Sequence, residues 1–367
     1  MTDTELKNLK DNLWHSVLIN DLEQIIDSAR QRVAVTVNAE LTMMYWHIGE
    51  RINREILGNQ RAEYGKQIVS TVATQLQELY GTKGFEPRTI RRMMQFASLF
   101  PDIQIVTPLV TQLSWSHFLA VMPLKDEIQR EFYLTMAASE HWSKRMLQSK
   151  IDSMLFERTA IAQKPDELIK QELAELRDDN KMSPDLVFKS PYFLEFTGLK
   201  GCYSEKSLED SLVVHLEQFI LELGNGFTFV ERQKRMIIDG EDFYLDLLFF
   251  HRKLHRLIAI DLLCCAQHNR SQITHQDVGQ MDMYVRMYDE LKRTEGDNPT
   301  FGLILCSKTS ADMARYSILK ENKQLFQAKY LTYLPTEEEL RQEIERQKEI
   351  FLEQQKGKDI NNLFVEE

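Results

Sequence analysis

The fold is decided by two apolar stretches, Phe243–Phe250 (FYLDLLFF) and Leu257–Leu263 (LIAIDLL), which a short polar turn separates. Folded as a hairpin with Lys253-Leu254 at its tip, they place Asp246 directly opposite Asp261. Opposed strand residues have Cβ atoms roughly 4.5–5.5 Å apart, and like charges at that distance are destabilising. The pair therefore indicates a cation between the two carboxylates, and a divalent metal is the natural candidate.

The preceding stretch supports this register. Residues 227–238 are typical of a strand, and they end at Asp239-Gly240, a strong hairpin turn signal. Pairing about that turn puts Gln233 beside Asp246 and Arg235 beside Tyr244. A slip of one residue would turn either aspartate to the other face, so the alternative of two strand-end carboxylates in water stays open.

Composition limits the classes of protein. The chain has 367 residues, 43% of them hydrophobic and 28% charged, as expected for two or three globular domains. No stretch approaches the roughly 18 apolar residues of a membrane span, and the polar N-terminus lacks a signal-peptide core. Four cysteines, two of them adjacent, form no disulfide framework. We expect a cytoplasmic protein without a membrane partner.

Charge is distributed unevenly. Residues 1–165 carry 19 basic and 19 acidic side chains, whereas residues 166–367 carry 26 and 37 and hence the whole net charge of −11. Residues 51–100 carry 8 basic and 4 acidic side chains. Any phosphate-binding patch is therefore local and is best sought in that window.

The first half is predicted to be helical. Apolar residues at helical spacing predict helices over 22–54, 65–79 and 90–100, with a glycine-containing break at 81–84. Helix, glycine turn and helix is the outline of a helix-turn-helix. Arg88, Arg91 and Arg92 begin its second helix and are candidate nucleic-acid contacts, although a solvated helix face has the same pattern.

Two other patterns are weaker. Ser114 and Ser116 near His117 suggest a hydrolase, but the chain has no G-x-S-x-G elbow and no positioned acid. Cys264-Cys265 with His268 and His275 match no standard zinc spacing.

The second half is predicted to be mixed. A helix at 204–223 precedes strands at 227–238, 242–251 and 256–263, a helix at 277–291, a buried strand at 301–306 and an edge strand at 325–334. The helical pattern also continues over 151–158 and 165–176. We thus expect an α+β protein with a helical domain at 1–165, a linker at 166–189, an α-β-β-β-α-β domain at 190–335 and an acidic helical tail at 336–367.

This order, with an acid on the second strand and an acid on the third, resembles the restriction-endonuclease-like PD-(D/E)xK nuclease superfamily, and within it the YhcG family. The resemblance covers roughly residues 15–340 and is carried by the stretches 61–66, 112–117, 224–235, 240–249 and 279–281. It implies an N-terminal DNA-binding helical domain, a C-terminal nuclease-like domain and Mg²⁺ or Mn²⁺ as cofactor.

The resemblance also implies roles for particular residues. Asp246 matches the second-strand aspartate, Asp261-Leu262-Leu263 matches the Glu-x-Lys element, and Glu209 matches the acid of the first helix. Gln280 and Tyr284, one helical turn apart, are similar to a Gln-x-x-x-Tyr element.

The chain departs from the family pattern at Leu263, where the lysine is missing. Electrostatic contributions of that kind are worth on the order of 3–4 kcal/mol, so the loss could cost about 10²–10³ in rate. Arg235 on the same predicted face, or Arg270 from the following loop, are candidate replacements.

Three functions remain open. The first is a metal-dependent DNA endonuclease, with DNA as partner. The second is a degenerate nuclease fold that binds nucleic acid or protein without cutting. The third is a structural module whose helices at 22–54 and 337–355 bind partners, a second copy of the chain among them.

Overall fold

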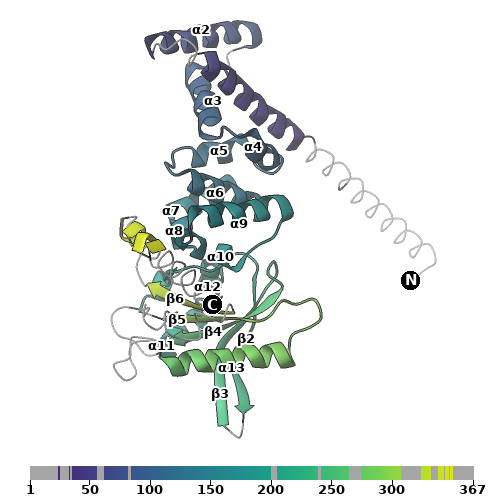
Figure 1. Ribbon diagram of the computed structural model, residues 1–367, viewed down its shortest axis with the longest axis vertical. Coiled ribbons are helices and arrows are strands. Elements are labelled where there is room, and N and C mark those ends of the chain that lie inside the picture. Colours follow the sequence, from purple (N-terminus) through teal and green to yellow (C-terminus); the bar gives the residue numbers. More distant parts are fainter. Residues whose placement is uncertain are drawn as a thin grey trace, which may run out of the picture. The chain divides into compact units, whose positions relative to one another are not determined.

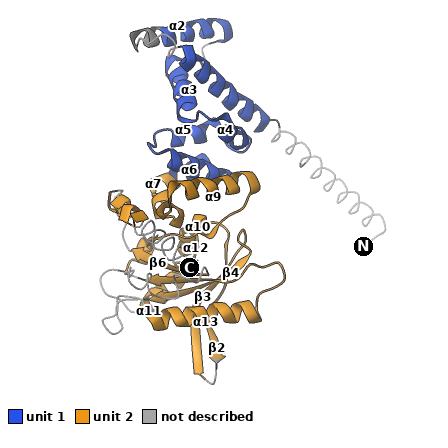
Figure 2. Ribbon diagram, in the orientation of Figure 1, with its two compact units in different colours: residues 1–149 blue, residues 150–367 orange. Residues whose placement is uncertain are grey.

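The computed structural model describes residues 24, 33, 35–55, 62–81, 84–199, 205–238, 241–263, 274–306, 324–331, 338–342, 344–346 and 348–349. They form two compact units, residues 1–149 and residues 150–367, which are coloured separately in Figure 2. Helix α7 (Lys144–Asp152) spans the boundary between the units.

Unit 1 is helical throughout its described residues (Figure 1). The predicted helices are present: the first is described at 35–55, and the next two are α2 (Ala62–Tyr80) and α3 (Pro87–Leu99). The remaining helices are α4 (Ile103–Val110), α5 (Trp115–Val121) and α6 (Glu127–Ser139).

The helix at 35–55 crosses α3 at very close range. A Cβ atom at Gly49 would lie 2.0 Å from the backbone oxygen of Met93, so only glycine allows this approach. Nearby, the indole nitrogen of Trp46 donates to the carbonyl of Phe100 at 2.8 Å. Apolar side chains of the first helix, α2 and α3 complete this core: Ile52, Val69, Ala73 and Ile90. The amphipathic periodicity of the sequence is therefore used to pack these three helices together.

Unit 2 begins with short helical segments. They are α8 (Leu155–Arg158), η1 (Ala160–Gln163), α9 (Asp166–Asp179) and α10 (Pro184–Val187). The stretch 166–189, expected to be a linker, thus contains two helices, and Ile169, Leu173 and Leu176 of α9 are buried. The acidic tail is described as helical at 338–342, 344–346 and 348–349, and Lys348 binds Asp166 of α9 at 2.8 Å.

A six-stranded mixed sheet forms the centre of unit 2. Its strands are β1 (Tyr192–Phe193), β2 (Phe227–Ile238), β3 (Glu241–His251), β4 (Arg256–Leu263), β5 (Phe301–Cys306) and β6 (Leu325–Leu331), in the order β1-β6-β5-β4-β3-β2. The pairs β2–β3 and β3–β4 are antiparallel and the others parallel. The predicted α-β-β-β-α-β order is confirmed. The strand predicted at 325–334 is observed as β6, but its predicted edge position is wrong, because β1 pairs with its outer side at Tyr330 and Leu331.

The predicted register is observed in both hairpins. Leu248 pairs with Ala259 and Phe250 with Leu257 in β3–β4, and Arg235 pairs with Tyr244 in β2–β3. Two irregularities interrupt β2. The register shifts between residues 229 and 231, and Gln233 has a left-handed backbone with φ of 47°. Such a conformation is uncommon outside glycine and indicates a local constraint.

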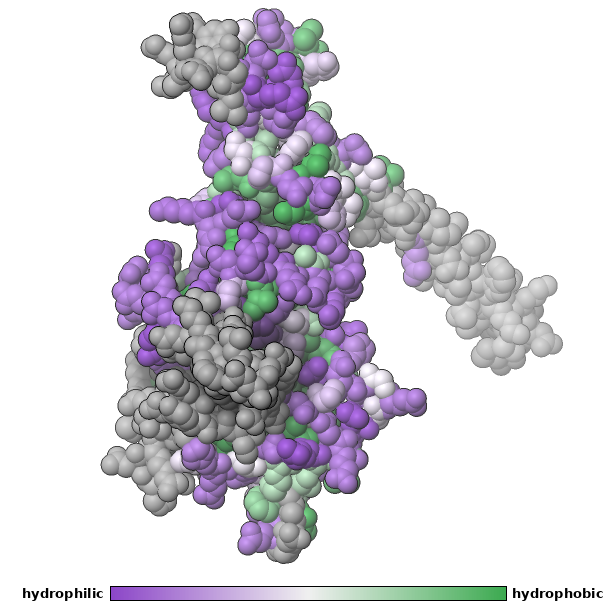
Figure 3. Space-filling view, viewed as in Figure 1, coloured by the Kyte–Doolittle hydropathy of each residue, from purple (hydrophilic) through white to green (hydrophobic). Residues whose placement is uncertain are grey.

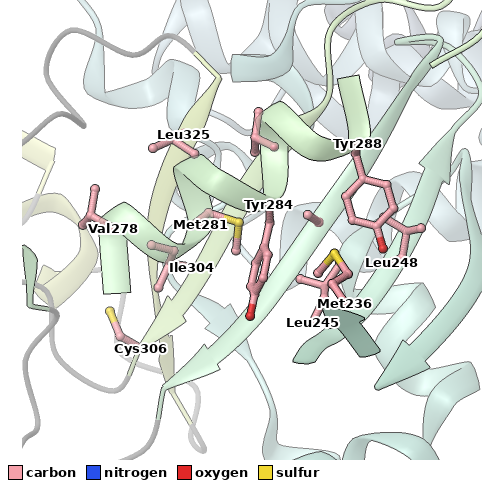
Figure 4. Packing of buried hydrophobic residues seen from close by; sticks show 12 residues of the cluster. Met236, Leu245, Leu248, Val278, Met281, Tyr284, Tyr288, Ile304, Cys306 and Leu325 are labelled. Carbon is pink, nitrogen blue, oxygen red and sulfur yellow. The ribbon is translucent and has the colours of Figure 1, made fainter. Parts of the chain in front are cut away.

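Helices cover both faces of the sheet. On one face, α13 (His275–Leu291) packs on β3, β4 and β5 through Val278, Met281 and Tyr284, as Figure 4 shows. On the other face, the predicted helix 204–223 is divided at His215 into α11 (Glu205–Val214) and α12 (Leu216–Leu223). Phe219 of α12 lies 6.1 Å from Phe249 of β3, ring centre to ring centre.

A buried ionic cluster joins the first segments of unit 2 to α12. The guanidinium of Arg158 donates to Glu222 at 2.5 Å, and the backbone N–H of Phe193 donates to the same carboxylate at 2.9 Å. The ammonium of Lys189 donates to the backbone carbonyl of Glu222 and lies 3.8 Å from its carboxylate. Both cationic side chains are buried, at 2% and 4% exposure, so Glu222 carries their compensating charge.

Candidate active site

Asp246 and Asp261 meet where β3 and β4 diverge. Strand pairing ends at Leu247 and Ile260, one residue before the two aspartates. Beyond that point the carboxylate of Asp246 accepts the backbone N–H of Leu262 at 2.8 Å, and it forms a hydrogen bond with the side chain of Asp261. The predicted proximity of the two carboxyl groups is therefore observed.

The second oxygen of Asp246 is also held. The side-chain amide of Gln233 donates to it at 3.0 Å, as the predicted register required. Burial raises the pKa of Asp246 to about 6, although the hydrogen bonds from Leu262, Asp261 and Gln233 act in the opposite direction. The negative charge of Glu209 raises this pKa further. A carboxyl group whose pKa is raised by burial and by a neighbouring negative charge is typical of a functional site.

Glu209 brings a third carboxylate from α11 toward this pair. Its side chain is 12% exposed, and its Oε1 atom is buried without a hydrogen-bond partner in the described structure. The nearest cation is the Nε atom of Arg232 on β2, at 4.0 Å, which is beyond hydrogen-bonding distance. Arg232 was not predicted from the sequence, because strand alternation places it on the side of β2 opposite to Gln233 and Arg235.

Gln280 and Tyr284 lie on one face of α13, as predicted. The amide of Gln280 donates to the hydroxyl of Tyr284 at 2.6 Å, and that hydroxyl donates to the backbone carbonyl of Tyr244 at 3.0 Å. Burial raises the pKa of Tyr284 to about 12, so the hydroxyl keeps the proton it donates. Tyr284 thus fixes β3 two residues before Asp246.

The lysine position of the family is apolar in both sequence and structure. Leu263 pairs with Cys306 of β5 and packs against the cluster under α13. The predicted replacement Arg235 is engaged elsewhere: its guanidinium donates twice to Asp242, both times at 2.9 Å, and its side chain is 56% exposed. The other candidate, Arg270, lies outside the described residues.

The donor set fits a hard divalent cation. Asp246, Asp261 and the unpartnered oxygen of Glu209 offer only carboxylate oxygens, the ligands that Mg²⁺ and Mn²⁺ prefer. Over the described residues, however, no group of three or more His, Cys, Asp or Glu side chains is close enough to enclose a metal. The arrangement therefore fits a cation held by one or two carboxylates with water or phosphate completing the shell, as is usual for Mg²⁺.

The three arginines of unit 1 lie at the start of α3. Arg88 and Arg91 are exposed, Arg92 is half-buried, and none of the three forms an ion pair with another described residue. Helix α3 contains no acidic residue, and Pro87 occupies its first turn. This end of the unit is largely hydrophilic in Figure 3.

The two weaker patterns of the sequence lead to no second site. Ser114 and His117 do contact each other at 3.0 Å, but together they cap the first turn of α5, and the other ring nitrogen of His117 bonds to the carbonyl of Trp142. Cys264, Cys265 and His268 lie outside the described residues.

A cavity of about 550 Å³ lies elsewhere in unit 2, between α9, the residues that follow it and the turn between β3 and β4. Lys164, which follows η1 and is one of the lysines that line this cavity, is bound to Glu172 and Asp185. None of the predicted site residues lines it, so the carboxylate geometry rather than this cavity defines the candidate site.

Every helix in the described part of the chain is too short or too polar to cross a membrane.

Comparison with known proteins places both halves of the chain in described families. Residues 21–158 match the family "DUF1016 N-terminal domain", and residues 185–345 match "YhcG PDDEXK nuclease domain". The protein "Putative nuclease YhcG" of Escherichia coli (strain K12) is 31% identical over an alignment of 352 residues, and the match covers 88% of this chain and 91% of that protein. A solved repair endonuclease from Pyrococcus abyssi is 18% identical, with a TM-score of 0.24 over 37% of this chain and 50% of that chain.

The fold and the matches define the class: a helical N-terminal region followed by a PD-(D/E)xK nuclease domain. The chain belongs to the YhcG family.

Proposed function

We propose that the protein is a metal-dependent endonuclease that hydrolyses phosphodiester bonds of DNA in the cytoplasm. Asp246 and Asp261 would hold Mg²⁺ or Mn²⁺, and Glu209 would support them from α11. The observation that supports this most is the contact between the half-buried carboxyl group of Asp246 and the buried one of Asp261, at the point where β3 and β4 diverge. Without a cation such a contact is electrostatically unfavourable once both groups are ionised.

The surrounding residues hold these ligands in place. Gln233 and the N–H of Leu262 fix the two oxygens of Asp246, and Tyr284 fixes the strand that carries it. Bound Mg²⁺ would polarise the phosphate and make a coordinated water more acidic. In the reaction, the attacking water would release a proton to solvent as its oxygen bonds to phosphorus. The P–O ester bond would break, and the leaving oxygen would take a proton from solvent.

A cleavage assay tests this function. Linear and supercoiled DNA are incubated with wild type, Asp246→Ala and Asp242→Ala, in the presence of Mg²⁺ or Mn²⁺. Asp242 is the matched control, because it lies on the same strand but is exposed and paired with Arg235. We expect cutting by wild type and Asp242→Ala and none by Asp246→Ala. Equal cutting by all three would show that these carboxylates are not the site.

A second candidate function is a nuclease fold that binds nucleic acid or a protein partner without cutting it. The apolar packing of Leu263 supports it, because no cation occupies the lysine position of the family. Here wild type would bind DNA without cleaving it, and Leu263→Lys would gain cleavage. Cutting by wild type excludes this alternative.

We further propose that α3 holds the DNA backbone through Arg88, Arg91 and Arg92. Each lost phosphate contact lowers the slope of log affinity against log salt by about 1. We therefore expect Arg88→Gln and Arg91→Gln each to reduce this slope, measured by fluorescence anisotropy of labelled DNA. Arg51→Gln is the control, since Arg51 is exposed on a neighbouring helix but paired with Glu55. An unchanged slope in all variants contradicts the proposal.

A further inference from the structure

The carboxylate cluster requires a cation besides the metal. Hydrolysis of a phosphodiester builds negative charge on the phosphate oxygens in the transition state, and a positioned positive group stabilises it. Leu263 offers none. Among the described cations of β2, Lys234 is bound to Glu231 at 2.8 Å and Arg235 to Asp242 at 2.8 Å.

Arg232 differs from these two cations. Its one ionic contact in the described structure is the 4.0 Å approach of Nε to Glu209, too long for a hydrogen bond. Its side chain is 45% exposed, so a ligand can reach the guanidinium. The group therefore lies at the carboxylate cluster with its donors still available.

The backbone of β2 explains how Arg232 comes to lie there. Successive strand residues normally point to opposite faces of a sheet. Here Gln233 contacts Asp246 and Arg232 approaches Glu209, so two neighbouring side chains end at one acidic cluster. Gln233 itself has a left-handed backbone, with φ of 47°, and β2 is the edge strand of the sheet. Backbone strain of this kind persists where the surroundings enforce it, and it concentrates at functional sites.

We infer that Arg232 binds the scissile phosphate and supplies the positive charge that Leu263 lacks. This inference rests on the proposed nuclease function. A guanidinium presents paired donors that match two phosphate oxygens. Arg232 is then a catalytic residue, and its approach to Glu209 is the resting arrangement that substrate replaces.

Three variants test the inference: Arg232→Ala, Arg232→Lys and the control Lys234→Ala. Lys234 lies on the same strand with a similar exposure of 41%, and its loss removes the same charge. Cleavage rates are measured at saturating Mg²⁺, with DNA affinity measured in Ca²⁺. We expect Arg232→Ala to lower the cleavage rate about 10²–10³-fold, Arg232→Lys to keep part of the rate, and Lys234→Ala to stay within threefold of wild type.

Two further readouts separate catalysis from a structural role. Added guanidinium chloride at low millimolar concentration should restore part of the rate of Arg232→Ala and leave Lys234→Ala unchanged. Mn²⁺ affinity should be unchanged or higher in Arg232→Ala, because a positive charge near Glu209 is removed. A rate that guanidinium does not restore, together with weakened Mn²⁺ binding, would overturn the inference in favour of a structural role.

The failure of the inference differs from the failure of the proposed function. If wild type cuts DNA and the cleavage rate of Arg232→Ala is within threefold of the wild-type rate, Arg232 is not the phosphate ligand, although the proposed nuclease function is supported. If wild type cuts nothing with either metal, both proposals fall.

Discussion

The buried cluster around Glu222 makes a strong prediction about stability. Changing Glu222 to glutamine keeps the shape and the hydrogen-bonding oxygen but removes the charge that compensates Arg158 and Lys189. Breaking a buried ion pair by removing one partner costs about 3–5 kcal/mol. The glutamine still accepts from Phe193, so we expect the lower end, about 3 kcal/mol. For a unit of this size that corresponds to a fall in melting temperature of about 6–12 °C.

The two units can be followed separately in this experiment. All four tryptophans, Trp14, Trp46, Trp115 and Trp142, belong to residues 1–149, so their fluorescence reports unit 1. Circular dichroism at 222 nm reports both units, and the transition without a fluorescence counterpart belongs to unit 2. Only that transition should move in Glu222→Gln.

Glu217→Gln is the matched control, because Glu217 lies on the same helix and is exposed. It should change stability by less than about 0.5 kcal/mol. If Glu222→Gln melts within about 2 °C of wild type, the cluster does not depend on this charge and the reasoning is refuted.

Three other predictions concern single contacts. Burial lowers the pKa of Lys189 to about 7 from its usual 10.5. Between these two values the unfolded chain binds more protons than the folded chain, so the stability of the wild type should rise from pH 7 to about pH 10. Urea denaturation over this pH range measures the rise, which Lys189→Met should lack, and parallel stability profiles of the two proteins would contradict this prediction. Gly49→Ala brings a Cβ to 2.0 Å from the backbone of Met93, so unit 1 should lose at least about 1–3 kcal/mol, seen by tryptophan fluorescence. A melting curve like that of wild type would show that the helices do not cross so closely. Tyr284→Phe leaves the carbonyl of Tyr244 and the amide of Gln280 without their partner, which should cost about 1–3 kcal/mol by circular dichroism; unchanged stability would mean that water replaces the hydroxyl.

Local sequence patterns predicted the part of the fold that surrounds the candidate site. The alternation of 227–263 and its two turns predicted the register of β2, β3 and β4, and hence the contact of Gln233 with Asp246. A one-residue slip would have buried the wrong face, which is why this register is strongly specified. The helices of unit 1 could also be predicted from local patterns, because each has apolar residues at helical spacing and its own start and end signals.

Features that depend on distant residues could not be predicted. The two-residue strand β1 has no periodicity of its own, and it pairs with β6, which is far away in sequence. The helix over 165–176 was predicted, but the burial of α9 and the short helix α10 depend on contacts that the sequence does not reveal, so 166–189 was expected to be a linker. Arg232 was missed because strand alternation placed it away from Gln233, whereas its guanidinium lies 4.0 Å from Glu209. The roles of the site residues, a homodimer and a cytoplasmic location stay predictions.

The central claim is that Asp246 and Asp261 hold a divalent cation. Isothermal titration of Mn²⁺ into wild type, Asp246→Asn and the control Asp242→Asn tests it without any need for cleavage. The account predicts binding at one site in wild type and in Asp242→Asn, and at least a tenfold loss of affinity in Asp246→Asn. Equal Mn²⁺ affinity in wild type and Asp246→Asn would contradict it.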